Sequence, residues 1–268
     1  MAMATTHLTE QQIVARLRAG GSVFAEDEAS LLLAERLSPT ALESGVARRE
    51  RGLPLEHVLG WAAFDRHRVL VDERVFVPRR RTELLARAAA ALARAGDTVI
   101  DLCCGCGAVG LAIARRVPGI ALFATDIDPT AVANARRNVE PLEATVVEGD
   151  LFDALPASLR GTVAVIAVNA PYVPVDAIVF MPPEAREFES RVALDGGADG
   201  LDLHRRIAAA AGDWLAPSGH LLIESSAAQA PLTAAMMRAC GLASRIVRSD
   251  DLDATIVIGS SAAAETRA

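Results

Sequence analysis

Residues 169–172 read Asn-Ala-Pro-Tyr and include the only tyrosine of the chain. The Asn169 side-chain oxygen and the Ala170 carbonyl can accept both N–H bonds of a planar amide or exocyclic amine, while Pro171 holds the turn rigid and Tyr172 covers the planar group. Such a nitrogen is a weak nucleophile because its lone pair is delocalised. Fixing it beside an electrophilic methyl group favours transfer by orientation and by transition-state hydrogen bonds. The segment therefore indicates methyl transfer to nitrogen, with no general base required before the transfer.

A second set of residues, 101–107, is a glycine-rich turn that reads Asp-Leu-Cys-Cys-Gly-Cys-Gly. Gly105, Gly107 and the later Gly110 match the dinucleotide fingerprint, in which glycines allow a tight turn and a close approach of the backbone to a ligand. Asp126 follows at a distance typical of the carboxylate that accepts both ribose hydroxyls. The match fits S-adenosylmethionine and NAD equally, because both carry an adenosine ribose.

Other residues favour S-adenosylmethionine. Asp150 can accept a hydrogen bond from the adenine amino group, and Leu151 with Phe152 can flank the ring. Hydride transfer needs an acid or base, yet none of the five histidines is predicted at a strand end beside the turn, and the chain has no lysine for a tyrosine–lysine pair. The predicted cofactor-binding residues are Cys103, Cys104, Gly105, Cys106, Gly107, Asp126, Asp150, Leu151 and Asn169.

Three of the four cysteines, at positions 103, 104 and 106, crowd the same turn. No fourth ligand stands at zinc spacing, so we expect no metal site. The spacing is also unlike a disulfide framework, and the N-terminus lacks the pattern of a secretory leader. These features favour a reducing cytoplasm.

The composition weighs against two kinds of partner. A net charge of −7 disfavours nucleic acid, whose affinity depends on phosphate contacts, although arginine clusters at 48–51 and 79–81 keep that option open. The longest apolar region, residues 162–183, is interrupted by Asn169, Asp176 and several prolines, so no membrane span is predicted.

The elements that must position the candidate residues alternate along the chain. Strands are predicted at 98–102, 120–125, 145–147, 162–168 and 220–224, and helices at 108–117, 129–139, 201–215 and 231–240. An antiparallel pair at 243–247 and 255–258 completes the pattern. Alternation with short links predicts an α/β fold with a doubly wound parallel sheet. Ligands of such sheets bind at the carboxyl ends of the strands, where both candidate segments stand.

The first part of the chain has a different pattern. Thr9 with Gln12 fits a capping box, and Ser38 before Pro39 fits a cap and a first helical position. We expect a helical substrate-recognition domain at 1–62, a linker at 63–95 and the methyltransferase domain at 96–268. The linker is predicted to hold a hairpin, with strands at 69–71 and 75–77 joined through 72–74, and a helix at 82–95.

Four segments together resemble the HemK/PrmC family of protein-(glutamine-N5) methyltransferases. Residues 54–60 with Phe64 resemble the family's linker region, and residues 77–83 (Val-Pro-Arg-Arg-Arg-Thr-Glu) resemble its I-P-R-P-x-T-E segment. The glycine-rich turn resembles its D-L-G-T-G-S-G, and residues 169–172 resemble its N-P-P-Y. Glu189, residues 193–200 and 219–224, and Gln229 extend the match. N-P-P-Y alone also occurs in adenine-N6 nucleic-acid methyltransferases, but the combination of segments is specific.

The resemblance implies a class I S-adenosylmethionine-dependent methyltransferase with a Rossmann-like sheet, releasing S-adenosylhomocysteine. It implies a glutamine acceptor in a partner protein, such as the GGQ loop of a peptide-release factor or a ribosomal protein. Residues 103–107, Asp126 and Leu151 would line the cofactor site, and residues 169–172 would hold the glutamine. Neither a membrane nor a nucleic-acid partner is expected.

The chain departs from the family pattern at three places. Ala170 replaces the first proline of N-P-P-Y, which keeps the carbonyl but removes a restraint. Arg80 and Arg81 replace a proline and an acid. Cys103 replaces the first glycine of the turn, where a positive φ would be costly. The identity of the substrate therefore stays open, with an adenine-N6 nucleic-acid methyltransferase, a small-molecule methyltransferase and a cofactor-binding module without turnover as alternatives.

Overall fold

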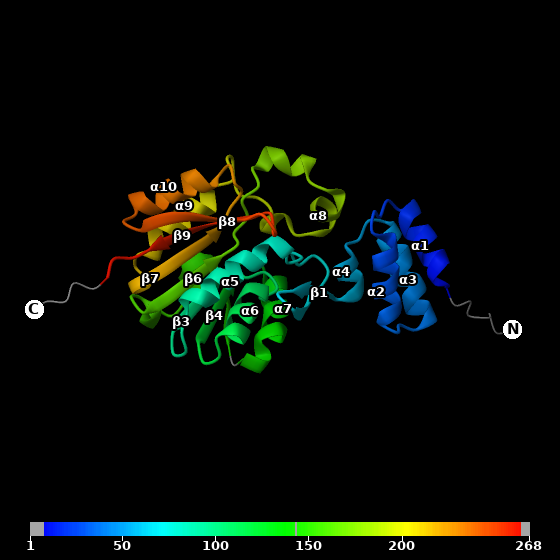
Figure 1. The fold of residues 1–268 in the computed structure, drawn as a ribbon, viewed down its shortest axis with the longest axis horizontal. Helices are drawn as coiled ribbons and strands as arrows, with labels where there is room; N and C mark the ends of the chain where they lie inside the picture. Colours follow the sequence, from blue (N-terminus) through cyan, green and yellow to red (C-terminus); the bar gives the residue numbers. More distant parts are fainter. Residues whose placement is uncertain (1–7, 143, 264–268) are drawn as a thin grey trace, which may run out of the picture.

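The computed structural model describes residues 8–142 and 144–263. Figure 1 shows an α/β body with a small group of helices, α1–α3, at one end and the strands β8 and β9 toward the other. Among the described residues, no helix combines the length and apolar character needed to cross a membrane.

The helical group comprises α1 (Glu10–Ala19), α2 (Ala25–Ala34) and α3 (Pro39–Glu50), followed by the short α4 (Leu55–Leu59). Its core is separate from those of the sheet and includes Ile13 and Leu32, both fully buried. Thr9 forms the predicted capping box with Gln12, and Ser38 caps α3 ahead of Pro39. Both predicted helix starts are confirmed.

The hairpin prediction was wrong in its position. The hairpin pairs β1 (Trp61–Phe64) with β2 (His67–Leu70), and its turn is Asp65-Arg66, with φ of 44° and 69°. Two successive positive φ values make a turn that normally carries Gly or Asn, so this sequence gave no signal for it. Val75 and Val77, predicted as strand residues, are instead buried in an irregular segment.

The main sheet has seven strands in the order β5-β4-β3-β6-β7-β9-β8. β3 to β7 run parallel, and β9 pairs antiparallel with both β7 and β8. The chain order reverses between β3 and β6, the place where doubly wound sheets bind ligands. The strands are β3 (Thr98–Leu102), β4 (Ala121–Asp126), β5 (Thr145–Glu148), β6 (Val163–Val168), β7 (Leu215–Glu224), β8 (Ala243–Ser249) and β9 (Ala254–Ser260).

Helices cover both faces of this sheet, so its central strands are buried on both sides. On β6, Val165 belongs to the core beneath α5 (Glu83–Leu92), α6 (Ala108–Arg116) and α7 (Pro129–Val139). Its neighbour Ile166 belongs to the core beneath α9 (Asp202–Ala211) and α10 (Ala230–Ala239). A strand with apolar residues on both faces gives a continuous apolar run, which is why β6 was predictable. The predicted doubly wound α/β fold is confirmed.

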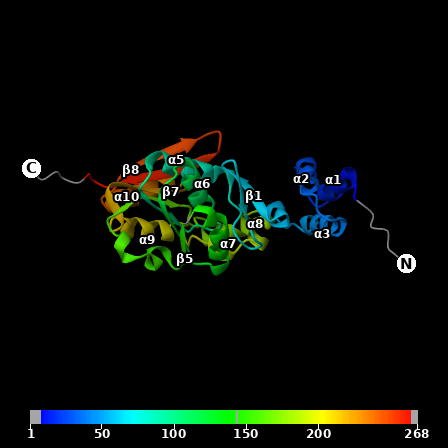
Figure 2. The ribbon, with the colours of Figure 1, turned by 90° about the horizontal axis from the view of Figure 1, so that it is seen from below.

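The segment after β6 connects the sheet to the helical group. It contains three short helices, η5 (Val175–Phe180), α8 (Pro183–Phe188) and η6 (Arg191–Ala193). Arg49 of α3 donates from Nε to Glu28 Oε2 at 2.8 Å and forms a second ion pair with Glu184 of α8, Nη1 to Oε1 at 2.7 Å. Figure 2 shows α8 near β1, toward the helical group. The buried Arg49 therefore ties the helical group to the segment that crosses the strand ends.

Candidate active site

A single cavity of about 670 Å³ lies at the carboxyl ends of β3, β4 and β6. It brings together every predicted cofactor-binding and catalytic residue except Gly107. Those in its wall are Cys103, Cys104, Gly105, Cys106, Asp126, Asp150, Leu151, Asn169, Ala170, Pro171 and Tyr172. The cavity therefore unites the glycine-rich turn with residues 169–172.

The turn between β3 and α6 has a positive φ at Cys103, the position where the family pattern has its first glycine. Cys103 has φ of 58°, in the left-handed region that is costly for a residue with a side chain. The Gly105 N–H donates to Asp126 Oδ2 at 2.8 Å, which joins the turn to the end of β4. Gly107 faces away from the cavity wall: a Cβ there would lie 3.1 Å from the Ala135 Cβ of α7. It allows the close packing of α6 on α7.

Carboxyl groups dominate this end of the cavity. Asp101 is fully buried and accepts from the Gly110 N–H at 2.7 Å, and burial raises its pKa to about 8. Asp126 accepts from the N–H groups of Gly105 and Asp128, and burial raises its pKa above the ordinary value as well. A carboxyl with a raised pKa is stabilised in its ionised form by a nearby cation. This end is therefore electrostatically suited to a ligand with hydroxyls and a positive charge.

The wall beyond Asp126 is partly apolar. Ile127 is 53% exposed and lines the cavity, as Val109 and Leu151 do. Asp150, predicted to accept from an adenine amino group, forms an ion pair with Arg206 of α9, with 2.7 Å between Oδ2 and Nη2. A carboxylate can accept several hydrogen bonds, so this pair still leaves capacity for a ligand. Ile127 was missed because an isolated apolar residue after an acid carries no sequence signal.

Of the cysteines of the turn, Cys104 and Cys106 are buried and Cys103 is half-buried. Burial is the main cause that raises the pKa of Cys103, of Cys104 and of Cys106, the last to about 12. Thiols in this state are weak nucleophiles and weak metal ligands, since both roles need the thiolate. Over residues 8–142 and 144–263, no cluster of three His, Cys, Asp or Glu side chains is placed to hold a metal.

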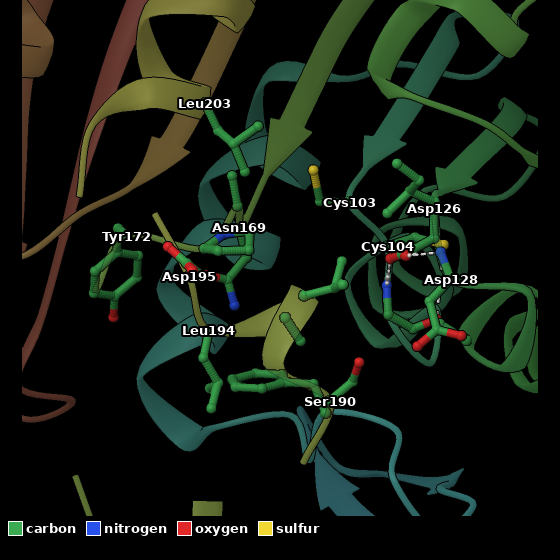
Figure 3. Close-up of a pocket in the computed structure, with 18 of the residues that line it drawn as sticks. Cys103, Cys104, Asp126, Asp128, Asn169, Tyr172, Ser190, Leu194, Asp195 and Leu203 are labelled. Atoms are coloured by element: carbon green, nitrogen blue, oxygen red, sulfur yellow. Dashed lines mark hydrogen bonds between the residues drawn. The ribbon is translucent and has the colours of Figure 1, made fainter. Parts of the chain in front are cut away.

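Asn169 lies at the centre of the other end of the cavity. Figure 3 shows its side chain extending into the open space, with Tyr172 on one side and the Cys103–Asp126 end on the other. Its Nδ2 donates to Thr82 Oγ1 at 3.4 Å. The bond engages the nitrogen of the amide, and Oδ1 accepts no hydrogen bond from another described residue. Asn169 therefore keeps an acceptor for a ligand N–H.

A buried carboxyl holds the Tyr172 side chain. The Tyr172 hydroxyl donates to Glu224 Oε1 at 3.4 Å, and Arg81 Nε donates to the same oxygen at 3.3 Å. Burial raises the pKa of Glu224 and, together with that carboxyl, raises the pKa of Tyr172 to about 12. Tyr172 is therefore a neutral phenol with a fixed ring, which suits contact with a planar group better than acid–base chemistry.

The backbone of Tyr172 is held from α10. Gln229 Nε2 donates to the carbonyl oxygens of Tyr172 at 3.0 Å and Asp199 at 3.1 Å. Gly200 has φ of 77°, and a Cβ there would overlap the Tyr172 carbonyl oxygen. Thr82, Gln229 and Gly200 stand in segments that the resemblance had matched, but their contacts with residues 169–172 required the structure.

Comparison with known proteins places the chain among methyltransferases. The family model "Methyltransferase small domain" matches residues 80–250. A protein of Geobacter sulfurreducens named release factor glutamine methyltransferase is 34% identical over 216 residues, which cover 80% of this chain and 75% of that protein. A Streptomyces pristinaespiralis protein named 4-amino-L-phenylalanine/4-methylamino-L-phenylalanine methyltransferase is 37% identical over 203 residues. These residues cover 73% of this chain and 69% of that protein.

Two solved structures share the fold. A methyltransferase from Pyrococcus furiosus superposes with a TM-score of 0.50 at 16% identity, covering 67% of this chain and 80% of that one. A Thermus thermophilus 16S rRNA N2 G1207 methyltransferase, solved with AdoMet and guanosine, superposes with a TM-score of 0.53 at 18% identity. The superposition covers 75% of this chain and 49% of that one. At these identities the likeness shows the fold alone, and it confirms the predicted class I methyltransferase fold.

Proposed function

The chain belongs to the release factor glutamine methyltransferase family, and from that premise we propose that it methylates the side-chain amide nitrogen of a glutamine in a partner protein. The methyl donor in this proposal is S-adenosylmethionine. The observation that carries the proposal is the position of residues 169–172, which lie in one cavity with the glycine-rich turn and Asp126.

The cofactor end fits this donor. When bound, S-adenosylmethionine supplies an electrophilic methyl group on a positively charged sulfur. Apart from Gly105 and its two chain neighbours, no described residue has a heavy atom within 4 Å of the place where a Cβ on Gly105 would stand, so a ligand can approach that backbone closely. Asp126 would accept the ribose hydroxyls, Ile127 and Leu151 would contact the adenine ring, and Asp150 would accept from its amino group. The buried carboxyls favour a cation at this end.

At the acceptor end, the chain's own groups would orient the glutamine. Asn169 Oδ1 and the Ala170 carbonyl would accept the two N–H bonds of the side-chain amide, as Thr82 fixes the Asn169 rotamer through Nδ2. The Tyr172 ring, held by Glu224, would cover the amide plane. Hydrogen bonds that pull both protons out of that plane localise the nitrogen lone pair, and so stabilise the transition state. The methylated nitrogen is strongly acidic and releases a proton to solvent.

The helical domain at 1–62 is proposed to recognise the partner protein, with the linker at 63–95 and the methyltransferase domain at 96–268. The separate core of the helical group supports this division, and the Arg49–Glu184 ion pair connects that group to the segment after β6. The proposed substrate is a peptide-release factor or a ribosomal protein, which would place the reaction in the cytoplasm.

A second candidate function has one specific observation in its favour. The S. pristinaespiralis relative is named for an amine-bearing free amino acid, and it is as similar to this chain as the glutamine methyltransferases are. An arylamine is also a planar nitrogen with two N–H bonds, so the same acceptors could hold it. Turnover of 4-amino-L-phenylalanine in the absence of any protein substrate would support this candidate.

The decisive experiment transfers a labelled methyl group from S-adenosylmethionine to a release factor or a ribosomal fraction. We expect peptide mass spectrometry to locate the label on a glutamine side chain. The sequence predicted Asn169 for both the cofactor set and the catalytic set, and we assign it to the acceptor alone. Asn169→Ala should therefore bind the cofactor normally and transfer almost none of the label. Full activity in Asn169→Ala, or label on a residue other than glutamine, would contradict the proposal.

A further inference from the structure

We propose that Arg81 binds a carboxylate of the substrate molecule, beside the nitrogen that accepts the methyl group. This inference rests on the proposed function and deepens it, because it restricts the substrate to molecules with an acidic group within a side chain's reach of the acceptor nitrogen.

Arg81 is placed next to the acceptor residues. It lines the cavity together with Asn169 and Tyr172, and its chain neighbour Thr82 is hydrogen-bonded to Asn169. Its side chain is 47% exposed, so solvent or a ligand can reach the guanidinium. Arg81 and Thr82 belong to one short 3-10 helix, η1 (Arg80–Thr82). Thr82 contacts the Asn169 side chain, while Arg81 lines the space that the rest of the substrate must fill.

The guanidinium is held at its Nε edge with the Tyr172 hydroxyl nearby, and no side chain among the described residues forms an ion pair with its terminal nitrogens. Its hydrogen bond to Glu224 uses Nε, at 3.3 Å. A guanidinium has further N–H donors on its two terminal nitrogens, in a fork that matches the two oxygens of a carboxylate. Because Glu224 orients the group from behind, little side-chain entropy would be lost when a carboxylate binds to the terminal nitrogens.

The charge of Arg81 is neutralised less fully than the charges of two other arginines of the cavity wall, Arg79 and Arg206. Arg79 pairs with Glu189 and Arg206 pairs with Asp150, at 2.6 and 2.7 Å. Arg81 has a longer contact to a carboxyl that also accepts from Tyr172 and whose burial disfavours its ionised form.

The test measures substrate affinity by calorimetry, with the full chain saturated with S-adenosylhomocysteine. One pair of probes is the blocked peptides Gly-Glu-Gln-Gly and Gly-Met-Gln-Gly. The other is 4-amino-L-phenylalanine and its carboxamide. In at least one pair, the wild-type chain should bind the acidic member about tenfold more tightly, as expected for a hydrogen-bonded ion pair. A preference within the peptide pair identifies the bound group as the carboxylate of a neighbouring side chain. A preference within the amino acid pair identifies it as an α-carboxylate.

Three variants locate the effect. Arg81→Met should lose the preference, Arg81→Lys should keep part of it, and Arg80→Ala should keep all of it, since Arg80 is exposed and outside the cavity wall. Unchanged affinity for S-adenosylhomocysteine confirms that each variant is folded. Equal affinities within both pairs for the wild-type chain, or a preference that survives in Arg81→Met, would overturn the inference. Acid-dependent binding without any methyl transfer to glutamine would instead contradict only the proposed function.

Discussion

The two ends of the cavity are built in different ways. The cofactor end comes from one stretch of chain, residues 101–151, and much of its geometry is backbone held by short hydrogen bonds such as Gly105 N–H to Asp126. The acceptor end joins residues 169–172 to Thr82, Glu224 and Gln229, which lie 87 residues before Asn169 and 52 and 57 residues after Tyr172. The first end is local and the second is assembled by long-range side-chain contacts.

This difference implies that the two ends can be disturbed separately. Substitutions at the acceptor end should leave cofactor affinity intact and reduce transfer. Substitutions at the cofactor end should change cofactor binding or stability first. Each prediction below tests one side of this separation.

The largest effect is expected for Asn169→Ala. The change removes the Oδ1 acceptor and the contact with Thr82, and the loss of one such preorganised hydrogen-bonding group costs about 10²- to 10³-fold in turnover. Steady-state kinetics with labelled cofactor measures kcat, and calorimetry measures cofactor affinity. A parallel loss of both would mean that Asn169 serves the cofactor end instead.

A smaller effect is expected for Gly200→Ala. Its Cβ would overlap the Tyr172 carbonyl oxygen and lie 2.5 Å from Gln229 Nε2, at a φ of 77°. The acceptor segment must shift, and a shift of that size should reduce turnover about tenfold or more. Gly212→Ala is the matched control, because nothing lies within 4 Å of its Cβ position. Equal activity of the two variants would show that Tyr172 tolerates displacement.

At the cofactor end, Asp101→Asn should change the pH dependence of stability. The folded pKa of about 8 lies above the ordinary value of 3.8, so between these pH values the folded state holds a proton that the unfolded state has lost. This contribution lowers the free energy of unfolding as pH rises from 4 to 8, by at most about 1.4 kcal/mol per pH unit. The Asp101→Asn variant has no titrating group at this position, and its side-chain oxygen can still accept the hydrogen bond from the Gly110 N–H.

Denaturant unfolding of the wild-type chain and Asp101→Asn at pH 5 and pH 7 checks this sign. The wild type should lose stability relative to the variant as pH rises. The titration of all other groups is common to both proteins, so it cancels when their free energies of unfolding are subtracted at each pH. Parallel pH profiles would show that Asp101 is ionised in the folded chain.

The smallest effect is expected for Ala170→Pro, which restores the family residue. Among the described residues the Ala170 N–H has no hydrogen-bond acceptor, and its carbonyl is retained. Proline should stabilise the chain by about 0.4–1 kcal/mol through the unfolded state, with kcat changed by less than about threefold. Thermal unfolding and kinetics measure both. A large loss of turnover would show that the acceptor segment needs the freedom that alanine gives.

The sequence predicted the sheet well and the hairpin poorly, for identifiable reasons. β3 and β6 have apolar residues on both faces, with the polar residues Asp101 near the end of β3 and Asn169 directly after β6, which is a strong local signal. The Asp65-Arg66 turn has no residue that marks a positive φ, while buried Val75 and Val77 imitate a strand. Gly107 matched the fingerprint, yet packs α6 on α7 rather than lining the cavity.

The same contrast holds for the site. Residues of the glycine-rich turn and residues 169–172 carry their chemistry in short motifs, so they could be found before the structure. The support of Asn169 by Thr82 and of Tyr172 by Glu224 joins segments far apart in the chain. Residue type and spacing do not encode such contacts, because they depend on the sheet order that places β6 beside both β3 and β7.

The separation of the two ends is tested most directly by the cofactor dependence of turnover in Asp126→Asn and Asn169→Ala. Asp126→Asn weakens the hydrogen bonds proposed for the cofactor ribose, so raising the concentration of S-adenosylmethionine should restore most of its rate. The same increase should leave Asn169→Ala almost inactive, because its cofactor site is intact. Rescue of both variants, or of Asn169→Ala alone, would contradict the assignment of the two ends.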